Sequence, residues 1–343
     1  MTHPIQLTAV ALMILLCSAA YGSNQETTAM SAVSRRLGRG TNVLGWDPIW
    51  QDAARAHFKA EHFKFIREAG FNHVRINLHP LRDGKPDADG KMDSQFFKTL
   101  DWAVDNALAN HLMVILDYHD DLAISPDPQG KRTVFLATWN AIAEHCKDRP
   151  ADVLFEILNE PAPKFTPELW NQYYRDALEV IRQSNPTRAV IVGPAMWNGI
   201  GGLDKLTLPE NDHNLIVTFH YYNPFEFTHQ GTSWTDRRDK TGVTWEATPR
   251  QREAIVQDFD RAKDWSTREQ RQLYLGEFGA FDKGDMDSRV RYVGFVAREA
   301  ERHGFSWANW QFTGDFIAFD MKKNKWVEPI RDALIPPEVL KDR

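Results

Sequence analysis

The sequence predicts a single-domain α/β protein in which eight strands alternate with helices and close into a (β/α)8 TIM barrel. The first observation behind this prediction is that eight short apolar runs alternate with longer amphipathic segments from residue 39 onward. The second is that most of these runs are almost continuously apolar, as is typical of parallel strands that helices cover on both faces. A strand-then-helix unit repeated eight times closes most simply into such a barrel.

The eight predicted strands are short runs rich in aliphatic and aromatic residues. They are Thr41–Gly45, Phe71–Leu78, Leu112–His119, Val153–Glu160, Ala189–Pro194, Asn214–Tyr222, Leu273–Phe278 and Phe305–Phe312. The alternative fold, a doubly wound open sheet, is disfavoured because no G-x-G-x-x-G motif follows the first run. No glycine-rich phosphate loop occurs elsewhere in the sequence either.

Six segments between the predicted strands carry apolar residues at helical spacing. They are His57–Ala69, Phe96–Ala109, Phe135–His145, Leu169–Gln183, Arg252–Trp265 and Arg289–His303. Two of them are followed by a glycine before the next strand, Gly70 and Gly304, which is a common helix stop. No linker, low-complexity tract or repeat interrupts the chain, so residues 36–343 are predicted to form one domain.

The N-terminal 22 residues resemble a secretory signal peptide. The apolar run Leu7–Cys17 precedes small residues and is too short to span a bilayer. No Lys or Arg precedes this run, and a buried N-terminal helix is the alternative interpretation. We expect residues 1–22 to be removed on export and residues 23–35 to form a flexible leader. The mature protein is then expected to be secreted or periplasmic.

Charge and composition exclude several classes of protein. The 343 residues include 41 Lys and Arg against 47 Asp and Glu, so no basic surface for nucleic acid is expected. A hydrophobic content of 42% excludes a disordered chain. Because Cys17 lies in the expected signal and only Cys146 remains, neither a disulfide nor a cysteine-based metal site is predicted. The 12 Trp are more than usual and serve either the core or a sugar-stacking groove.

Polar residues gather at the ends of the predicted strands, where a parallel barrel carries its active site. They are Asn42, Arg75, His119, Asn159, Glu160, Trp197, His220, Tyr222, Glu277 and Trp310. Glu160 and Glu277 end the fourth and seventh runs, so their carboxylates are predicted to face each other across the barrel mouth. Two carboxylates on either side of one bond are the requirement of glycoside hydrolysis.

Five motifs at these strand ends resemble glycoside hydrolase family 5, and most closely its bacterial endo-β-1,4-glucanase and mannanase branch. They are Arg39-Gly40-Thr41-Asn42, His73-Val74-Arg75-Ile76, Ile157-Leu158-Asn159-Glu160-Pro161, His220-Tyr221-Tyr222-Asn223-Pro224-Phe225 and Gly276-Glu277-Phe278-Gly279. Their order along the chain is also that of the family. The resemblance covers about residues 36–334.

The resemblance implies that Glu160 is the acid/base and Glu277 the nucleophile of a retaining, endo-acting β-1,4-glucanase. It also implies an active-site set of Arg75, His119, Asn159, His220, Tyr222 and Trp310, with sugar contacts from His229 and Trp234 in the loop after the sixth strand. Asn42 and Trp197 are further candidates for substrate binding. The implied partner is a β-linked polysaccharide, and we expect a monomer that needs no cofactor or metal and, once mature, contacts no membrane.

The residue types fit this chemistry. Two carboxylates about 5–5.5 Å apart repel by roughly 3 kcal/mol at a dielectric constant near 20, about two pKa units. This repulsion keeps one of them protonated. We expect Glu277 to be ionised because Arg75 and Tyr222 can stabilise its charge, and Glu160 to hold the proton. Asn159 is predicted to bond the sugar's 2-hydroxyl, and Trp310 to stack on the pyranose ring.

Two departures from the family pattern concern sugar selectivity. His119 is followed by Asp120 where the branch often has a second histidine, and Asn309 stands where an aromatic residue is common. An endo-β-1,4-mannanase is therefore the alternative substrate assignment. Two other classes stay open, a carbohydrate-binding protein without catalysis and a metal-dependent barrel hydrolase. The ligands of the latter would be His119, Asp120, Asp121 and His220.

Overall fold

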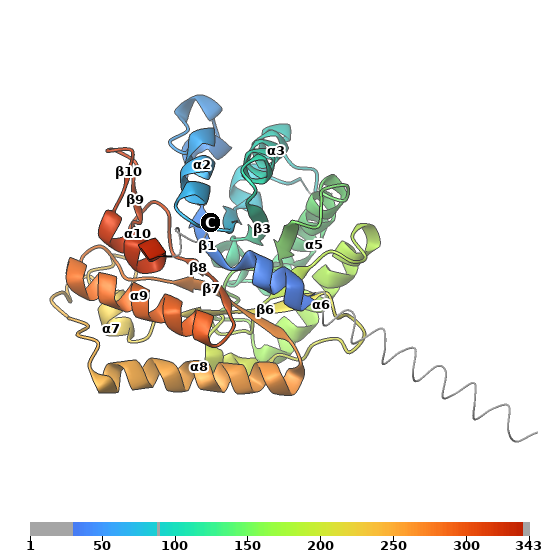
Figure 1. Cartoon of the computed structure of the whole chain (residues 1–343). Coiled ribbons are helices and arrows are strands. Elements are labelled where there is room, and N and C mark those ends of the chain that lie inside the picture. The colour runs from blue at the N-terminus through green and yellow to red at the C-terminus, as the bar shows by residue number, and fades with distance from the viewer. Residues whose placement is uncertain (1–29, 88–89, 339–343) are drawn as a thin grey trace, which may run out of the picture.

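Eight parallel strands form a closed barrel in chain order in the computed structural model, which describes residues 30–87 and 90–338 (Figure 1). The strands are β1 (Arg39–Val43), β2 (His73–Leu78), β3 (Met113–Tyr118), β4 (Val153–Glu156), β5 (Val190–Val192), β6 (Leu215–Tyr221), β7 (Gln272–Phe278) and β8 (Ser306–Asn309). The barrel closes through β1 and β8, with Thr41 opposite Asn309. The predicted fold class is confirmed, and each predicted strand overlaps the observed strand of the same rank.

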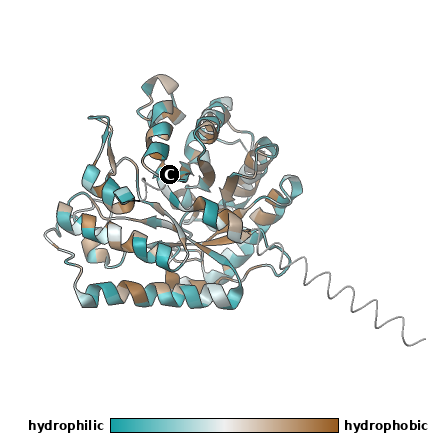
Figure 2. Cartoon of the chain, in the orientation of Figure 1, coloured by the Kyte–Doolittle hydropathy of each residue, from teal (hydrophilic) through white to brown (hydrophobic). Residues whose placement is uncertain are grey.

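Helices surround the barrel and cover the outer face of its sheet (Figure 1). They are α2 (Ala60–Glu68), α3 (Ser94–Ala109), α4 (Asp121–Ile124), α5 (Pro128–His145), α6 (Pro167–Ser184), α7 (Phe225–Thr228), α8 (Pro249–Glu269), α9 (Met286–Arg302) and α10 (Glu328–Leu334). All six predicted helices are confirmed. Figure 2 shows hydrophobic and hydrophilic residues alternating along α8 and α9, as expected for helices with one buried face.

Local capping sets where several helices begin. The side chains of Asp93, Thr166, Thr248 and Asp285 each accept a hydrogen bond from a backbone N–H in the first turn of α3, α6, α8 and α9. Such caps satisfy donors that the helix itself leaves unpaired. The predicted helices at these places start a few residues late because the prediction followed apolar spacing rather than caps.

Short elements that the sequence did not reveal complete the fold. They are the 3-10 turns η1 (Pro48–Trp50), η2 (Ala53–Arg55) and η4 (Ile200–Lys205), the π-helical turn η3 (Pro80–Gly84), and a hairpin of β9 (Phe319–Asp320) and β10 (Lys325–Trp326). The connection between β5 and β6 holds η4 instead of an α-helix. Gly201 and Gly202 lie within this turn, and glycine disfavours an α-helix.

The N-terminal end of the barrel is covered by a helix over residues 30–37, where the sequence analysis expected a flexible leader up to residue 35. Met30 and Leu37 are buried there and pack with Met113 and Ile115 of β3 inside the barrel. The domain boundary predicted at residue 36 is therefore too late, because Met30, Val33 and Leu37 form one apolar helical face. The expected signal peptide, residues 1–22, lies outside the described residues.

Three tryptophans on the outer helices take part in the packing of the core. Trp139, Trp170 and Trp265 are buried in α5, α6 and α8, so these three belong to the core. Among residues 30–87 and 90–338, no helix has the length and apolar character needed to cross a membrane.

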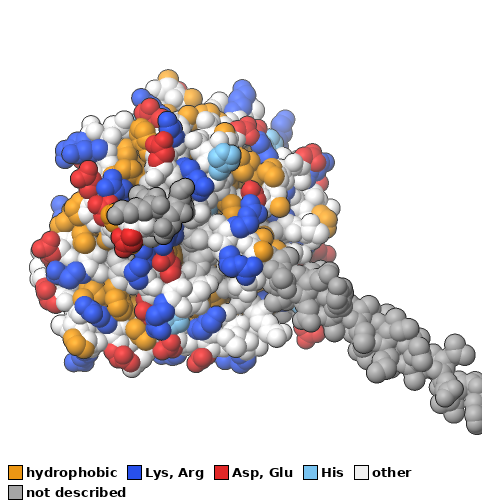
Figure 3. Space-filling model, viewed as in Figure 1, with side chains coloured by type: hydrophobic (Ala, Val, Ile, Leu, Met, Phe, Trp, Pro, Cys, Tyr) orange, Lys and Arg blue, Asp and Glu red, His pale blue; other side chains and the backbone are white. Residues whose placement is uncertain are grey.

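On the face drawn in Figure 3, positive and negative side chains are interspersed, in keeping with the small net charge of −6.

Candidate active site

Arg75 lies at the centre of a buried network inside the C-terminal half of the barrel. Its Nε and Nη2 donate to the two carboxylate oxygens of Glu156, at 2.7 and 2.8 Å. Asp117 lies 3.1 Å from the same guanidinium, and none of the three side chains is exposed. Burial without charge partners would be very costly, so the two carboxylates fix both the charge and the plane of Arg75.

The upper side of Arg75 faces the residues that the motifs singled out. Nη1 donates to Oδ1 of Asn42 and to Oε1 of Glu277, both at 2.8 Å, and Nη2 donates to Oδ1 of Asn159 at 2.9 Å. Strand register brings these groups together, since Asn42 pairs with Arg75 across β1 and β2. Arg75 thus links strands β1, β2, β4 and β7 beneath the barrel mouth.

Glu277 lies near the end of β7 and is held from two sides. Besides Arg75, the hydroxyl of Tyr222 donates to its Oε2 at 2.9 Å. Burial raises the pKa of Glu277 to about 7, while His220 and Arg75 lower it and the charge of Glu160 raises it. Arg75 and Tyr222 were predicted to stabilise this carboxylate, and both donate a hydrogen bond to it.

Glu160 follows β4 in a loop and approaches Glu277 from the other side of the mouth. Its Oε1 lies 2.6 Å from Nδ1 of His220, and its side chain is 21% exposed. Burial raises the pKa of Glu160 to about 8, with Arg75 acting in the opposite direction. Glu160 is therefore the better proton carrier at neutral pH. The largest cause of this raised pKa is burial, and not the charge repulsion between the two glutamates that was expected from the sequence.

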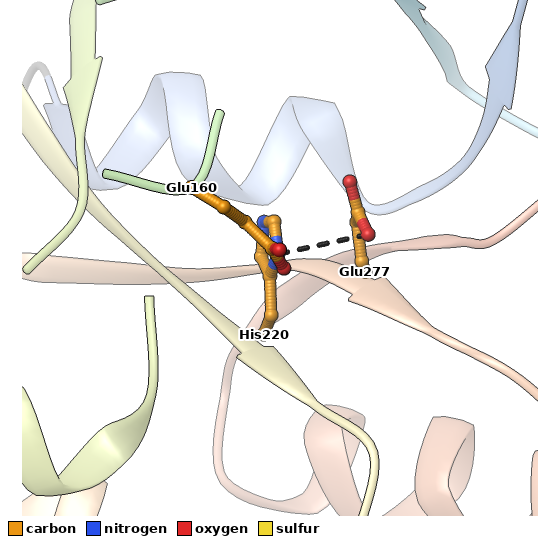
Figure 4. A group of neighbouring side chains, drawn as sticks. All are labelled: Glu160, His220 and Glu277. Carbon is orange, nitrogen blue, oxygen red and sulfur yellow. Dashed lines mark hydrogen bonds and ion pairs between the residues drawn. The ribbon is translucent and has the colours of Figure 1, made fainter. Parts of the chain in front are cut away.

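His220 lies between the two glutamates (Figure 4). Its Nδ1 is 3.6 Å from Oε2 of Glu277, and one ligand atom from each of the three side chains lies within 4.8 Å of the others. Asn198 donates toward Nε2 at 3.4 Å, which leaves Nδ1–H to donate to Glu160. Burial lowers the pKa of His220, so the imidazole is neutral in this setting.

Trp310 and His119 form a flat wall beside the glutamates. Their rings stack at 5.3 Å with planes only 7° apart, and Trp310 is partly exposed. Nδ1 of His119 lies 2.6 Å from Oδ2 of Asp117, and burial lowers the pKa of His119 well below its usual range. A neutral imidazole thus supports an indole face that remains accessible from the mouth.

The more distant candidates have different surroundings. Trp197 and Trp234 are 53% and 56% exposed, on the loops after β5 and β6. His229 is buried, stacks on Phe225 at 4.0 Å and lies edge-on to Tyr222 at 4.8 Å. Burial lowers the pKa of His229 to about 4. His229 thus packs against Tyr222, and its contact with sugar stays a prediction.

Asn42 does not reach the mouth, contrary to the predicted contact with substrate. It is fully buried, its Nδ2 donates to the carbonyls of Gly276 and Asn309, and its Oδ1 accepts from Arg75 and Asn77. Both polar atoms of the Asn42 side chain are therefore hydrogen-bonded within the protein. Its expected place at a strand end suggested a position at the barrel mouth. In the structure β1 continues to Val43, so Asn42 lies within the strand.

Sequence reasoning missed several residues of this network. Glu156 and Asp117 are single charges in otherwise apolar strands, and a buried charge always needs a partner, which was a usable signal. Asn198 had no such signal. Its position depends on a left-handed backbone over residues 196–198, where Nδ2 also donates to the carbonyl oxygen of Asn159. Trp46, which is 68% exposed after β1, was also missed.

The four ligands of the alternative metal-dependent site do not converge on one point. His119 contacts Asp117, whereas Asp120 accepts from the backbone of Leu81 and contacts His79. In the part of the chain that the structure describes, the group with metal-ligand spacing is Glu160, His220 and Glu277. These are the same side chains that the glycosidase assignment uses.

Comparison with known proteins decides the family. The family model described as cellulase, glycosyl hydrolase family 5, matches residues 31–315. The chain belongs to glycosyl hydrolase family 5. This family 5 chain is 32% identical over 291 residues to Endoglucanase H of Acetivibrio thermocellus, covering 83% of the chain and 30% of the relative. It is 25% identical to Endoglucanase 3 of Fibrobacter succinogenes, covering 87% and 52%. The family 5 chain thus spans about a third to a half of these two relatives.

Solved structures of family 5 enzymes resemble the whole barrel. Cel5A of Thermotoga maritima in complex with cellobiose superimposes with a TM-score of 0.84 and 37% identity, covering 89% of this family 5 chain and 99% of that one. The same Cel5A in complex with mannotriose gives the same score, identity and coverage. The resemblance to family 5 inferred from the five motifs is confirmed.

Proposed function

We propose that this protein is an endo-acting, retaining glycoside hydrolase that cleaves β-1,4-linked glucan. The observation that carries this proposal is the pair Glu160 and Glu277, whose facing carboxyl oxygens lie within 4.8 Å. Such close carboxyl oxygens fit retaining enzymes, whose two carboxyl groups lie about 5–5.5 Å apart, better than inverting enzymes, whose carboxyl groups lie about 6.5–9.5 Å apart to leave room for a water.

In the first step, Glu160 gives its proton to the glycosidic oxygen while a carboxylate oxygen of Glu277 attacks the anomeric carbon. The bond from that carbon to the leaving oxygen breaks, and a glycosyl ester with Glu277 forms. Arg75 and Tyr222 hold Glu277 in place by hydrogen bonds to different oxygens. Burial raises the pKa of Glu160 to about 8, which keeps the acid protonated near neutral pH.

In the second step, Glu160 takes a proton from water, whose oxygen attacks the same carbon and releases Glu277. The ester has no charge, so the negative charge that Glu277 contributed near Glu160 is absent, and Glu160 gives up its proton more readily. His220 donates to Glu160 and keeps its carboxyl turned toward the reacting centre in both steps. Two inversions at one carbon give net retention.

Exposed aromatic side chains on three loops are the candidate platforms for further sugars. Trp46, Trp197 and Trp234 are each more than half exposed and lie on the loops after β1, β5 and β6. Together with Trp310 they offer flat faces to successive pyranose rings. Several aromatic platforms beyond the sugar being cleaved would favour attack within a polysaccharide.

β-1,4-Glucan is the preferred substrate in this proposal because relatives named endoglucanases match most of the chain. Endo-β-1,4-mannanase is the second candidate, since the similar Cel5A has a structure in complex with mannotriose. The test is release of reducing ends from purified cellulose, mixed-linkage glucan, glucomannan and mannan. Faster release from glucans supports the assignment, and release from mannan alone would replace it with mannanase.

Retention is tested by proton NMR of the first product formed from a cello-oligosaccharide. The β-anomer is expected to appear first and then to mutarotate. First appearance of the α-anomer would rule out double displacement and with it the role of Glu277 as nucleophile.

Export by residues 1–22 and a monomeric state are part of the same proposal. Expression in a Gram-negative host should yield a protein in the periplasm or medium whose N-terminus is residue 23. Light scattering should give the mass of one chain. A cytoplasmic protein with an intact N-terminus would contradict the export signal.

A further inference from the structure

The amide of Asn159 is held between two groups that together decide its orientation. Its Oδ1 accepts from Nη2 of Arg75 at 2.9 Å, and its Nδ2 donates to Oδ1 of Asp121 at 3.1 Å. A flipped amide would place its NH2 against the Arg75 guanidinium, two groups that can only donate, so that contact would become repulsive. The flip would also remove the donor from the Asp121 oxygen that accepts in the observed orientation. The hydrogen bond to Asp121 uses one of the two Nδ2 protons, and the other is available to a sugar hydroxyl.

Asp121 belongs to a short turn that is tied to the loop carrying Glu160. It is the first residue of α4 and is buried, 6% exposed. Its backbone carbonyl accepts from the N–H of Ser125, whose hydroxyl accepts from the N–H of Ala162. The α4 turn therefore contacts the catalytic loop on both sides of Glu160, through Asn159 before it and Ala162 after it.

The protonation state of the Asp121 carboxyl is compatible with its role as hydrogen-bond acceptor for Asn159. Burial, followed by the nearby charge of Glu160, raises the pKa of Asp121 well above its usual range. A neutral carboxyl still offers its carbonyl oxygen to Asn159 and adds no further negative charge beside the glutamates. Its shape and polarity then match those of an asparagine side chain closely.

We propose that Asp121 is a positioning residue of the reaction, which orients the Asn159 amide so that its free proton meets the substrate's 2-hydroxyl in the transition state. This inference rests on the proposed function and on the predicted contact between Asn159 and the 2-hydroxyl. The contact stabilises the transition state more than the bound substrate, because hydrogen bonds to this hydroxyl strengthen as the oxocarbenium-like charge develops. Loss of the orientation should therefore lower kcat more than it raises KM.

The test compares two substrates, an aryl β-cellobioside and its analogue that lacks the 2-hydroxyl on the sugar undergoing cleavage. Asp121→Leu removes the acceptor while keeping the number and branching of the side-chain heavy atoms, and we expect kcat/KM for the cellobioside to fall about 10- to 100-fold. The same substitution should change kcat/KM for the 2-deoxy analogue by less than about threefold, since the contact is absent there. Asp121→Asn keeps the acceptor and should retain most of the activity on both substrates.

A double-mutant cycle covers the case in which Asp121→Leu disturbs folding. In an Asn159→Ala background, Asp121→Leu should have no further effect on kcat, because its target is gone. Equal losses on both substrates, or full additivity with Asn159→Ala, would overturn the positioning role. If wild-type protein fails to hydrolyse the cellobioside at all, the proposed function itself fails, which separates the two outcomes.

Discussion

At the level of single residues, the two glutamates differ because their neighbours differ. Glu277 receives hydrogen bonds from Arg75 and Tyr222, whereas Glu160 receives one from His220 and keeps its proton more firmly. We expect kcat/KM to rise with pH as Glu277 ionises through about 7 and to fall as Glu160 ionises through about 8. Initial rates on an aryl cellobioside between about pH 5 and 10 measure this. A profile without an alkaline limb would contradict Glu160 as acid.

The hydroxyl of Tyr222 should matter for the acidic limb of that profile. Tyr222→Phe removes a donor to the Glu277 carboxylate, so its pKa should rise and the acidic limb should move to higher pH. A hydrogen bond to a charged group contributes roughly 1.5–3 kcal/mol, which predicts a fall in kcat/KM of about 10- to 100-fold. Tyr173→Phe is the matched control, because the buried Tyr173 hydroxyl has no hydrogen-bond partner among the described residues. If the acidic limb of the Tyr222→Phe profile does not move, the Tyr222 hydroxyl does not stabilise the Glu277 carboxylate.

At the level of elements, the barrel strands are held together by a charge network as well as by apolar packing. Glu156→Ala in β4 would leave Arg75 without its bidentate partner. Removing one member of a buried ion pair costs about 3–5 kcal/mol, so the free energy of unfolding should fall by this amount. Urea denaturation followed by tryptophan fluorescence measures it.

The control for that substitution is an exposed pair on the same fold. Asp152 bonds Arg36 at the surface, with side chains 37% and 55% exposed, and Asp152→Ala should cost less than about 1 kcal/mol. If Glu156→Ala costs no more than Asp152→Ala, the network does not stabilise the barrel as described.

The elements also show what sequence can predict. Near-continuous apolar runs give the eight strands. The motifs place Glu160 and Glu277 near the C-terminal ends of β4 and β7, whereas Arg75, expected at a strand end, lies in the middle of β2. The partners Glu156, Asp117 and Asn198 stay hidden, because nothing in the sequence says which buried group a lone polar residue meets. The helix over residues 30–37 was missed because its short apolar face, Met30 to Leu37, follows polar residues.

At the level of the whole molecule, we expect the buried carboxyl of Glu160 to make the fold less stable at high pH. Burial raises the pKa of Glu160 from 4.5 to about 8, so the folded state binds more protons than the unfolded one between these values. Stability should therefore decrease as pH rises through this range. Glu160→Gln removes the titration and should raise Tm at about pH 8 by several degrees, with little change at about pH 4.

Differential scanning calorimetry at the two pH values measures this difference, with the exposed Glu144→Gln as control. The side chain of Glu144 is 50% exposed and lies outside the barrel mouth. Equal Tm changes at both pH values would mean that the ionisation of Glu160 is not what costs stability.

The proposed mechanism requires that Glu277 becomes covalently attached to sugar. An activated 2-deoxy-2-fluoro-β-cellobioside slows both steps and lets the ester accumulate. Peptide mass spectrometry after brief incubation should find one fluorocellobiosyl group per chain, on the peptide that contains Glu277. Attachment to a different residue, or rapid turnover of this reagent without any covalent species, would contradict the mechanism.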